Sequence, residues 1–138
     1  MTPMKTSILS STLVLFAAAA CSSAPPYAAQ AIEDDAEAMS NVVVADSELY
    51  DIVRAGKAGV ERVPGSNQLK IAVPIRNIDD EPIQVLVQVS FLDGRRIPIG
   101  DDTNQQVKLI GPGSTLPIVV MSKFDTAQDW VMRISWNK

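Results

Sequence analysis

Residues 83–92 have the sequence IQVLVQVSFL, in which apolar residues at 83, 85, 87, 89 and 91 alternate with mostly polar ones. A period of two is typical of a β-strand with one buried face, because successive side chains point to opposite sides of a strand. The β-branched residues of this run also pack well on a pleated surface. The stretch therefore predicts a long strand that buries one face in a core.

The same period recurs along the chain from residue 41 onward. Residues 69–76 and 130–137 alternate in the same way, and turn sequences such as Asp79-Asp80-Glu81-Pro82, Asp93-Gly94 and Gly111-Pro112-Gly113 separate the runs. We expect strands over 41–45, 49–54, 58–63, 69–77, 83–92, 95–99, 106–110 and 115–121, with a ninth over 129–136. Short strands at regular spacing predict an all-β antiparallel sandwich or barrel of about seven to nine strands.

Two prolines and two tryptophans refine this expectation. Pro74 and Pro117 fall inside predicted strands, and a residue without a backbone N–H belongs at a sheet edge or a bulge. Open edges favour a sandwich over a closed barrel.

Trp130 and Trp136 have the same parity, so both are expected to point into the core. The alternative, a carbohydrate-stacking platform, requires an exposed indole.

The N-terminal residues have the layout of a bacterial lipoprotein signal. Lys5 is followed by an apolar stretch over 8–16, by three alanines at 18–20, and by Cys21, which is the single cysteine of the chain. Residues 1–20 are therefore expected to be removed, and Cys21 to become the lipidated first residue. The alternative is an ordinary signal cut after Ala29 or Ala31, which would leave a soluble periplasmic protein.

Residues 21–40 are expected to form a lipidated, disordered tether. They are rich in Ser, Pro and Ala and contain the acidic run 33–37, so they bury too little apolar surface to offset their ordering entropy. A short amphipathic helix over 28–39 is the alternative. The β-sandwich domain would then span 41–138. Ser22 follows the cysteine, which resembles the outer-membrane sorting rule of enteric bacteria.

The composition restricts the chemistry. The chain has 16 acidic and 12 basic residues, a formal net charge of −4 and no histidine. An acidic chain has no electrostatic attraction for nucleic acid. Without histidine the commonest general base and transition-metal ligand are missing, and no nucleophile or phosphate-loop motif is present. We therefore expect no catalytic residue, no cofactor and no nucleic-acid partner.

One group of residues is a candidate site. If strand direction reverses at every loop, the loops 78–82, 100–105 and 122–128 fall at one end of the sandwich. This predicts an acidic pole composed of Asp79, Asp80, Glu81, Asp101, Asp102 and Asp125. Such a pole suits Ca²⁺ or a basic partner, and the alternative is that these acids only keep turns soluble.

Residues 69–136 resemble the YcfL-like periplasmic lipoproteins of Gram-negative bacteria. The resemblance consists of Asn77 at the end of an alternating strand, the acidic turn 79–82, a long strand ending in Phe91-x-Asp93-Gly94, the Pro112-Gly113 turn and a closing alternating strand. It implies an immunoglobulin-like sandwich on a lipid tether and supplies no catalytic residue. The turn after Asp93 is shorter than is usual in that family.

These observations together predict an outer-membrane lipoprotein that faces the periplasm. It would be held to the membrane by its N-terminal lipid and would act as a non-enzymatic binding or scaffolding module with an envelope protein as its partner. The alternatives are a structural anchor subunit of a secretion or cell-wall machine, and an envelope hydrolase.

Overall fold

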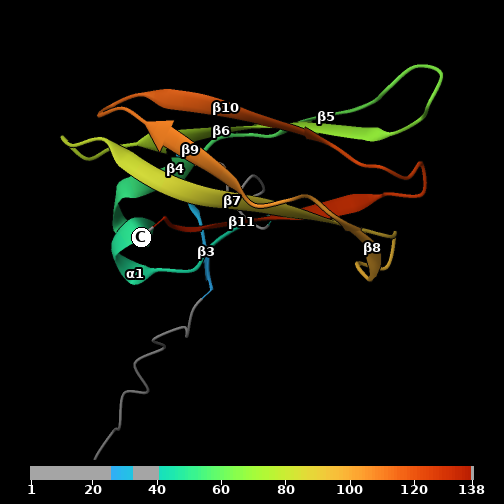
Figure 1. The fold of residues 1–138 in the computed structure, drawn as a ribbon, viewed down its shortest axis with the longest axis horizontal. Coiled ribbons are helices and arrows are strands. Elements are labelled where there is room, and N and C mark those ends of the chain that lie inside the picture. Colours follow the sequence, from blue (N-terminus) through green and yellow to red (C-terminus); the bar gives the residue numbers. More distant parts are fainter. Residues whose placement is uncertain (1–25, 33–40, 138) are drawn as a thin grey trace, which may run out of the picture.

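The computed structural model describes residues 26–32 and 41–137, which form two β-sheets packed face to face (Figure 1). Sheet A has the order β1 (Tyr27–Ala28), β3 (Val42–Val44), β11 (Asp129–Trp136), β7 (Ile83–Leu92) and β8 (Pro98–Asp102), and β9 (Gln106–Ile110) also pairs with β7. Sheet B has the order β10 (Thr115–Met121), β6 (Leu69–Asn77), β4 (Val53–Ala55) and β2 (Gln30–Ala31), and β5 (Gly59–Arg62) also pairs with β6. The predicted all-β sandwich is confirmed, but the described residues form eleven strands rather than seven to nine, and the β3–β11 and β2–β4 pairs are parallel.

The core lies between the long strands, as their alternation predicts. In β7 the residues at 83, 85, 87, 89 and 91 are all buried, and β6 buries 69, 71, 73 and 75. β11 pairs with β7 over eight residues and buries Trp130, Met132 and Ile134 against them, and Trp136 packs half-buried at the edge of the same core. Burying each such side chain contributes about 1.5–3 kcal/mol, so these faces provide most of the apolar stabilisation.

The strand predicted over 49–54 is wrong. Residues Ser47–Ile52 form the short helix α1, and β4 begins directly after it at Val53. Leu49 is fully buried and Ile52, three positions later, packs against the core, which is the spacing of one helix face. The helix therefore covers the end of the sandwich with the apolar residues that were assigned to a strand.

The strand predicted over 95–99 begins later, at Pro98. Asp93 extends the turn, because its Oδ1 accepts hydrogen bonds from the backbone N–H groups of Arg95 (2.8 Å) and Ile97 (2.9 Å). The left-handed backbone position in this turn is Arg96, with φ 61°. The hairpin predicted at Asp93-Gly94 is present, but its connection runs over 93–97.

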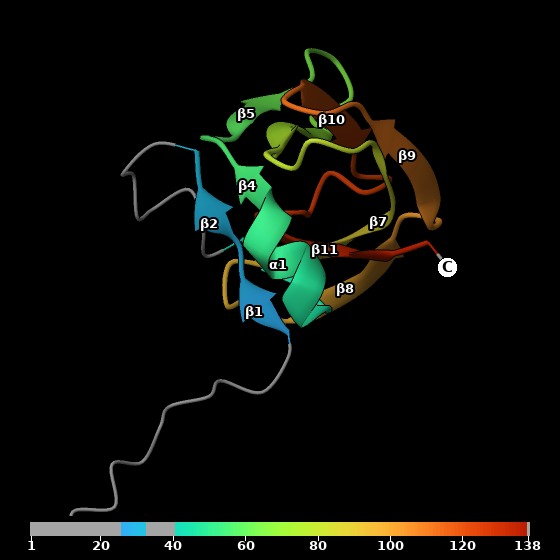
Figure 2. The ribbon, with the colours of Figure 1, turned by 90° about the vertical axis from the view of Figure 1, so that its left-hand side faces the viewer.

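Part of the predicted tether is folded. β1 pairs antiparallel with β3 in sheet A, and β2 pairs parallel with β4 in sheet B, so the chain crosses between the sheets at Ala29 (Figure 2). Ala29 is fully buried, and its N–H donates to the Val42 carbonyl at 2.9 Å. For residues 26–32 both the disordered tether and the alternative helix are therefore wrong. Residues 1–25, including Cys21, and 33–40 lie outside the described residues.

The two prolines lie opposite each other. Pro74 of β6 is the register partner of Pro117 of β10. Pro117 is on an edge strand, as predicted, whereas Pro74 is in a central one. Pro74 is tolerated there because its backbone faces the break between β4 and β5, where its carbonyl accepts a hydrogen bond from the Gly56 N–H at 2.8 Å. No ladder hydrogen bond is lost at either proline.

Gly56 lies in the break between β4 and β5, close to the ring of Pro74, and is therefore sensitive to substitution. A Cβ at Gly56 would lie 2.5 Å from Cγ of the rigid Pro74 ring, whereas a Cβ at Gly59 meets nothing closer than 3.9 Å. We expect Gly56→Ala to lower the free energy of unfolding by roughly 1–3 kcal/mol through overpacking, and Gly59→Ala to change it much less. Urea denaturation measures both. Equal stabilities would contradict the contact, and Pro74→Ala should rescue part of the loss in Gly56→Ala.

Candidate functional site

The six acids of the predicted pole lie at two opposite ends of the sandwich. Asp79, Asp80 and Glu81 are in the turn between β6 and β7, at the end where the loop 111–114 also lies. Asp101 and Asp102 pair with Phe91 and Ser90 at the other end of β7. Asp125 follows β10 at that same second end. A strand as long as β7 spans about 30 Å, so the prediction of one acidic pole is wrong.

The prediction of a single pole fails because the chain does not reverse direction between β8 and β9, where a turn was expected. β8 and β9 both run antiparallel to β7 and follow one another along the same edge, with Ser90 opposite Asp102 and Val87 opposite Gln106. Residues 103–105 therefore interrupt a strand without turning it. Every later loop falls at the end opposite to the one expected from strict alternation.

Asp101 has a structural role at the second end. Its side chain is 1% exposed, and its Oδ2 accepts hydrogen bonds from the backbone N–H groups of Lys123 (2.7 Å) and Phe124 (3.1 Å). These contacts join β8 of sheet A to the loop that follows β10 of sheet B. Ser122 completes the connection, because its hydroxyl accepts from the Leu69 N–H and donates to the Phe124 carbonyl.

Asn77 has the matching role at the first end. It is fully buried, and its Nδ2 donates to the carbonyls of Glu81 (2.8 Å), Ile110 (3.1 Å) and Gly111 (3.3 Å). Its Oδ1 accepts from the Asp79 N–H at 2.9 Å. The side chain thus joins β6 of sheet B to the end of β9 in sheet A and shapes the acidic turn. Its place at the end of an alternating strand was the sequence signal for this residue.

The remaining acids are largely solvated. Asp80, Glu81, Asp102 and Asp125 are exposed, and Asp79 is half-buried with its Oδ1 accepting from the Asp80 N–H. Across residues 26–32 and 41–137, no group of three or more His, Cys, Asp or Glu side chains is placed to hold a metal ion. In those same ranges no helix is long and apolar enough to cross a bilayer.

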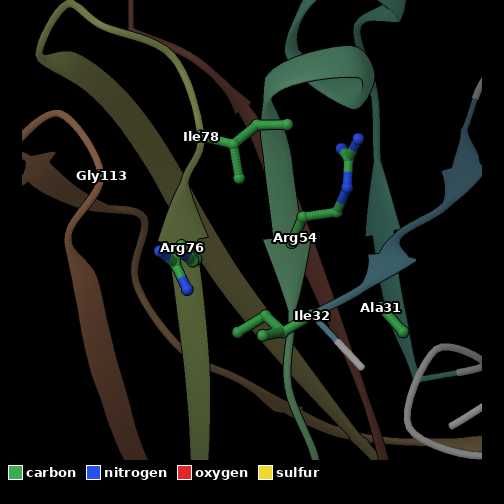
Figure 3. Close-up of a pocket in the computed structure, with 6 residues that line it drawn as sticks. All are labelled: Ala31, Ile32, Arg54, Arg76, Ile78 and Gly113. Atoms are coloured by element: carbon green, nitrogen blue, oxygen red, sulfur yellow. The ribbon is translucent and has the colours of Figure 1, made fainter. Parts of the chain in front are cut away.

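A shallow hollow of about 280 Å³ lies on the outer side of sheet B, and sequence reasoning did not predict it. It is lined by Ala31, Ile32, Arg54, Arg76, Ile78 and Gly113 (Figure 3). Arg54 and Arg76 are register partners on β4 and β6, and like charges directly opposite each other repel. Figure 3 shows the two guanidinium groups directed apart.

The two arginines differ in what they contact. The Arg54 guanidinium donates to the carbonyls of Tyr50, Asp51 and Val53, at the C-terminal end of α1, where a cation is favourable. Arg76 is exposed, and among the described residues it forms no ion pair. The hollow therefore offers one available cation beside the apolar side chains of Ile32 and Ile78, which is a small contact area for an anionic group.

Comparison with known proteins identifies the fold. No family model matches the chain, and no curated protein matches it. The structure is similar to the crystal structure of Campylobacter jejuni cj0090, with 16% identity and a TM-score of 0.58, over 70% of this chain and 98% of that one. It is also similar to a DUF1425 family member from Shewanella sp. pv-4, with 11% identity and a TM-score of 0.54, over 59% of this chain and 75% of that one. At these identities the likeness establishes the fold alone.

The neighbouring acids Asp101 and Asp102 give a direct test of a structural role. We expect Asp101→Ala to lower the free energy of unfolding by about 1–3 kcal/mol, because the two charge-assisted hydrogen bonds from the Lys123 and Phe124 N–H groups to this buried carboxylate are lost. Asp102→Ala, at an exposed position, should stay within about 0.5 kcal/mol of wild type. Asp101→Asn should fall between them, because its amide oxygen can still accept. Thermal and urea denaturation measure all three, and an Asp101→Ala protein as stable as Asp102→Ala would refute this role.

Proposed function

We propose that this chain is a lipid-anchored envelope lipoprotein whose folded part is a non-enzymatic binding or scaffolding module. The observation that carries the proposal is the folding of residues 26–32 so soon after Cys21. Only residues 22–26 separate Cys21 from the first paired residue, Tyr27. At about 3.3–3.6 Å per residue, such a connection reaches roughly 20 Å at most.

The folded segment favours lipidation over the ordinary signal. Cleavage after Ala29 or Ala31 would remove β1 together with the buried Ala29, and the later cut would remove β2 as well. The earlier cut would take an edge strand from sheet A, and the later cut would take one from each sheet. Cleavage before Cys21 leaves the whole described sandwich in the mature chain. The pairing of residues 27–31 therefore supports the lipoprotein signal over a cut after Ala29 or Ala31.

The buried polar side chains have structural partners. Asn77, Asp101 and Ser122 are the buried polar residues of the described ranges, and each of them is hydrogen-bonded to backbone groups of neighbouring turns. The bonds of Asn77 and Asp101 join the two sheets, whereas those of Ser122 join β6 to the loop after β10. None of these three side chains lines the hollow. A catalytic acid or base must reach the proton that it transfers.

The proposal extends to the location of the protein. The resemblance of residues 69–136 to YcfL-like lipoproteins and the Ser at position 22 both support the periplasmic face of the outer membrane. Attachment by acyl chains holds a protein firmly only with about two chains or more, at about 0.8 kcal/mol per buried methylene. A lipidated N-terminus would confine the module to two dimensions and raise its effective concentration near envelope partners.

Cys21→Ala tests the anchor. We expect the wild-type chain in the membrane fraction and Cys21→Ala in the soluble fraction, with an unchanged melting temperature because the described fold begins at Pro26. Fractionation measures the location, mass spectrometry of the mature N-terminus measures lipidation, and thermal denaturation measures the melting temperature. Ser22→Asp is the matched control, since it should stay lipidated while moving to the inner membrane. Retention of Cys21→Ala in the membrane would overturn the anchor.

Crosslinking in intact cells tests the binding role separately. Crosslinked species are expected for the wild-type chain and should weaken in Cys21→Ala, because the loss of the tether dilutes the protein. A chain that is anchored but forms no crosslinks, and that shows turnover lost on replacing an exposed acid, would favour the hydrolase alternative.

A further inference from the structure

The edge strands of the two sheets differ in how they resist pairing with another strand. β10 carries Pro117 as its third residue, opposite Pro74 and with its backbone turned away from β6. β5 has four residues, which include Gly59 and the charged Glu61 and Arg62. β8 has a register shift between Phe91 and Leu92 of its partner strand. Proline, charge, short length and irregular register are all devices that protect sheet edges.

β9 lacks most of these devices. Residues 106–110 contain no proline or glycine, and they keep a continuous register with β7 over all five positions. Within the described residues β9 pairs with β7 alone, so its other edge bears no strand. Val107 is 54% exposed and Leu109 is 64% exposed. These two side chains share the outer face of sheet A, so an added strand would find an apolar neighbour on that side.

Lys108 lies between them on the opposite face. Its register partner is the fully buried Val85, and Lys108 itself is half-buried at the rim of the core. Among the described residues it forms no ion pair. In self-association the antiparallel register that pairs all five residues places Lys108 directly opposite Lys108 of the second copy. Like charges in that position are destabilising, so the charge disfavours a second copy and favours an acidic partner.

We propose that the free edge of β9 is a docking site for an extended segment of a partner protein. That segment carries an acidic residue between two apolar residues. Its main chain extends sheet A, its apolar side chains cover Val107 and Leu109, and its carboxylate lies across from Lys108. Strand addition of this kind takes its affinity from main-chain hydrogen bonds and its specificity from alternate side chains. The inference rests on the binding module proposed above and names its surface and partner class.

The test uses the lipidated full chain, labelled with ¹⁵N, in detergent micelles. The probes are two peptides, acetyl-Ser-Ile-Glu-Ile-Ser-amide and the same peptide with Lys in place of Glu. We expect the Glu peptide to slow amide hydrogen exchange along residues 106–110 and to leave β10 unaffected. Its dissociation constant should be about threefold lower than that of the Lys peptide, as expected for a single cross-strand charge pair. A Glu peptide methylated on its backbone nitrogens should not bind.

Lys108→Glu provides the decisive variant. It should reverse the preference, so that the Lys peptide binds about threefold more tightly than the Glu peptide. Lys57→Glu, at an exposed position between β4 and β5, is the matched control and should keep the wild-type order. Thermal denaturation of each variant confirms that the fold is intact.

Several results would overturn the inference. They are the absence of β9 protection at millimolar Glu peptide, a preference unchanged by Lys108→Glu, or a dimer of the wild-type chain that protects β9 without peptide. Failure of the anchor remains distinguishable, because Cys21→Ala fractionation does not depend on β9. If the wild-type chain is membrane-anchored but does not bind the peptide, the proposed location stands and only the docking site on β9 is refuted.

Discussion

Sheet A depends on the pairing of β7 along both of its edges. On one side β11 pairs with eight of its residues, and on the other side β8 and β9 share the edge between them. A strand whose two edges are both occupied cannot accept another, so any further strand on that side of sheet A has to pair with β8 or β9 instead. The same pairing places Gln106 four residues along from Asp102 on one edge without a reversal. That single geometric fact determines which loops meet at each end of the sandwich and leaves β9 as an open edge.

Each end of the sandwich is then fixed by one buried polar side chain. Asn77 connects β6 to the carbonyls that end β9, and Asp101 connects β8 to the loop after β10. Both satisfy backbone groups in turns, where strand pairing no longer does so, and buried groups without partners are costly. Asp101, which was one of the predicted site residues, is therefore structural, and so is Asn77.

The sequence correctly predicts the strands in which the alternation of apolar and polar residues continues over enough positions to be unambiguous. The bounds expected for 69–77, 83–92, 106–110, 115–121 and 129–136 are those of β6, β7, β9, β10 and β11. β1 and β2 are two residues each, too short to show a period, and their partners are residues distant in sequence. The acidic pole failed for a different reason: residues 103–105, Thr-Asn-Gln, contain no glycine or proline, and a chain without such a turn signal need not reverse.

The two edges of sheet A have different surroundings in an anchored protein. β1 forms one edge, close in sequence to Cys21, and β9 lies on the far side beyond β3, β11 and β7. Figure 2 shows β1 and β9 on opposite sides of β11 and β7. At about 4.8 Å between strands, four steps separate these edges by roughly 19 Å. A connection from Cys21 that reaches roughly 20 Å keeps the β1 edge near the bilayer. Under the proposed lipid anchor, the pairing across β7 therefore makes the β9 edge the farther of the two edges from the attachment point.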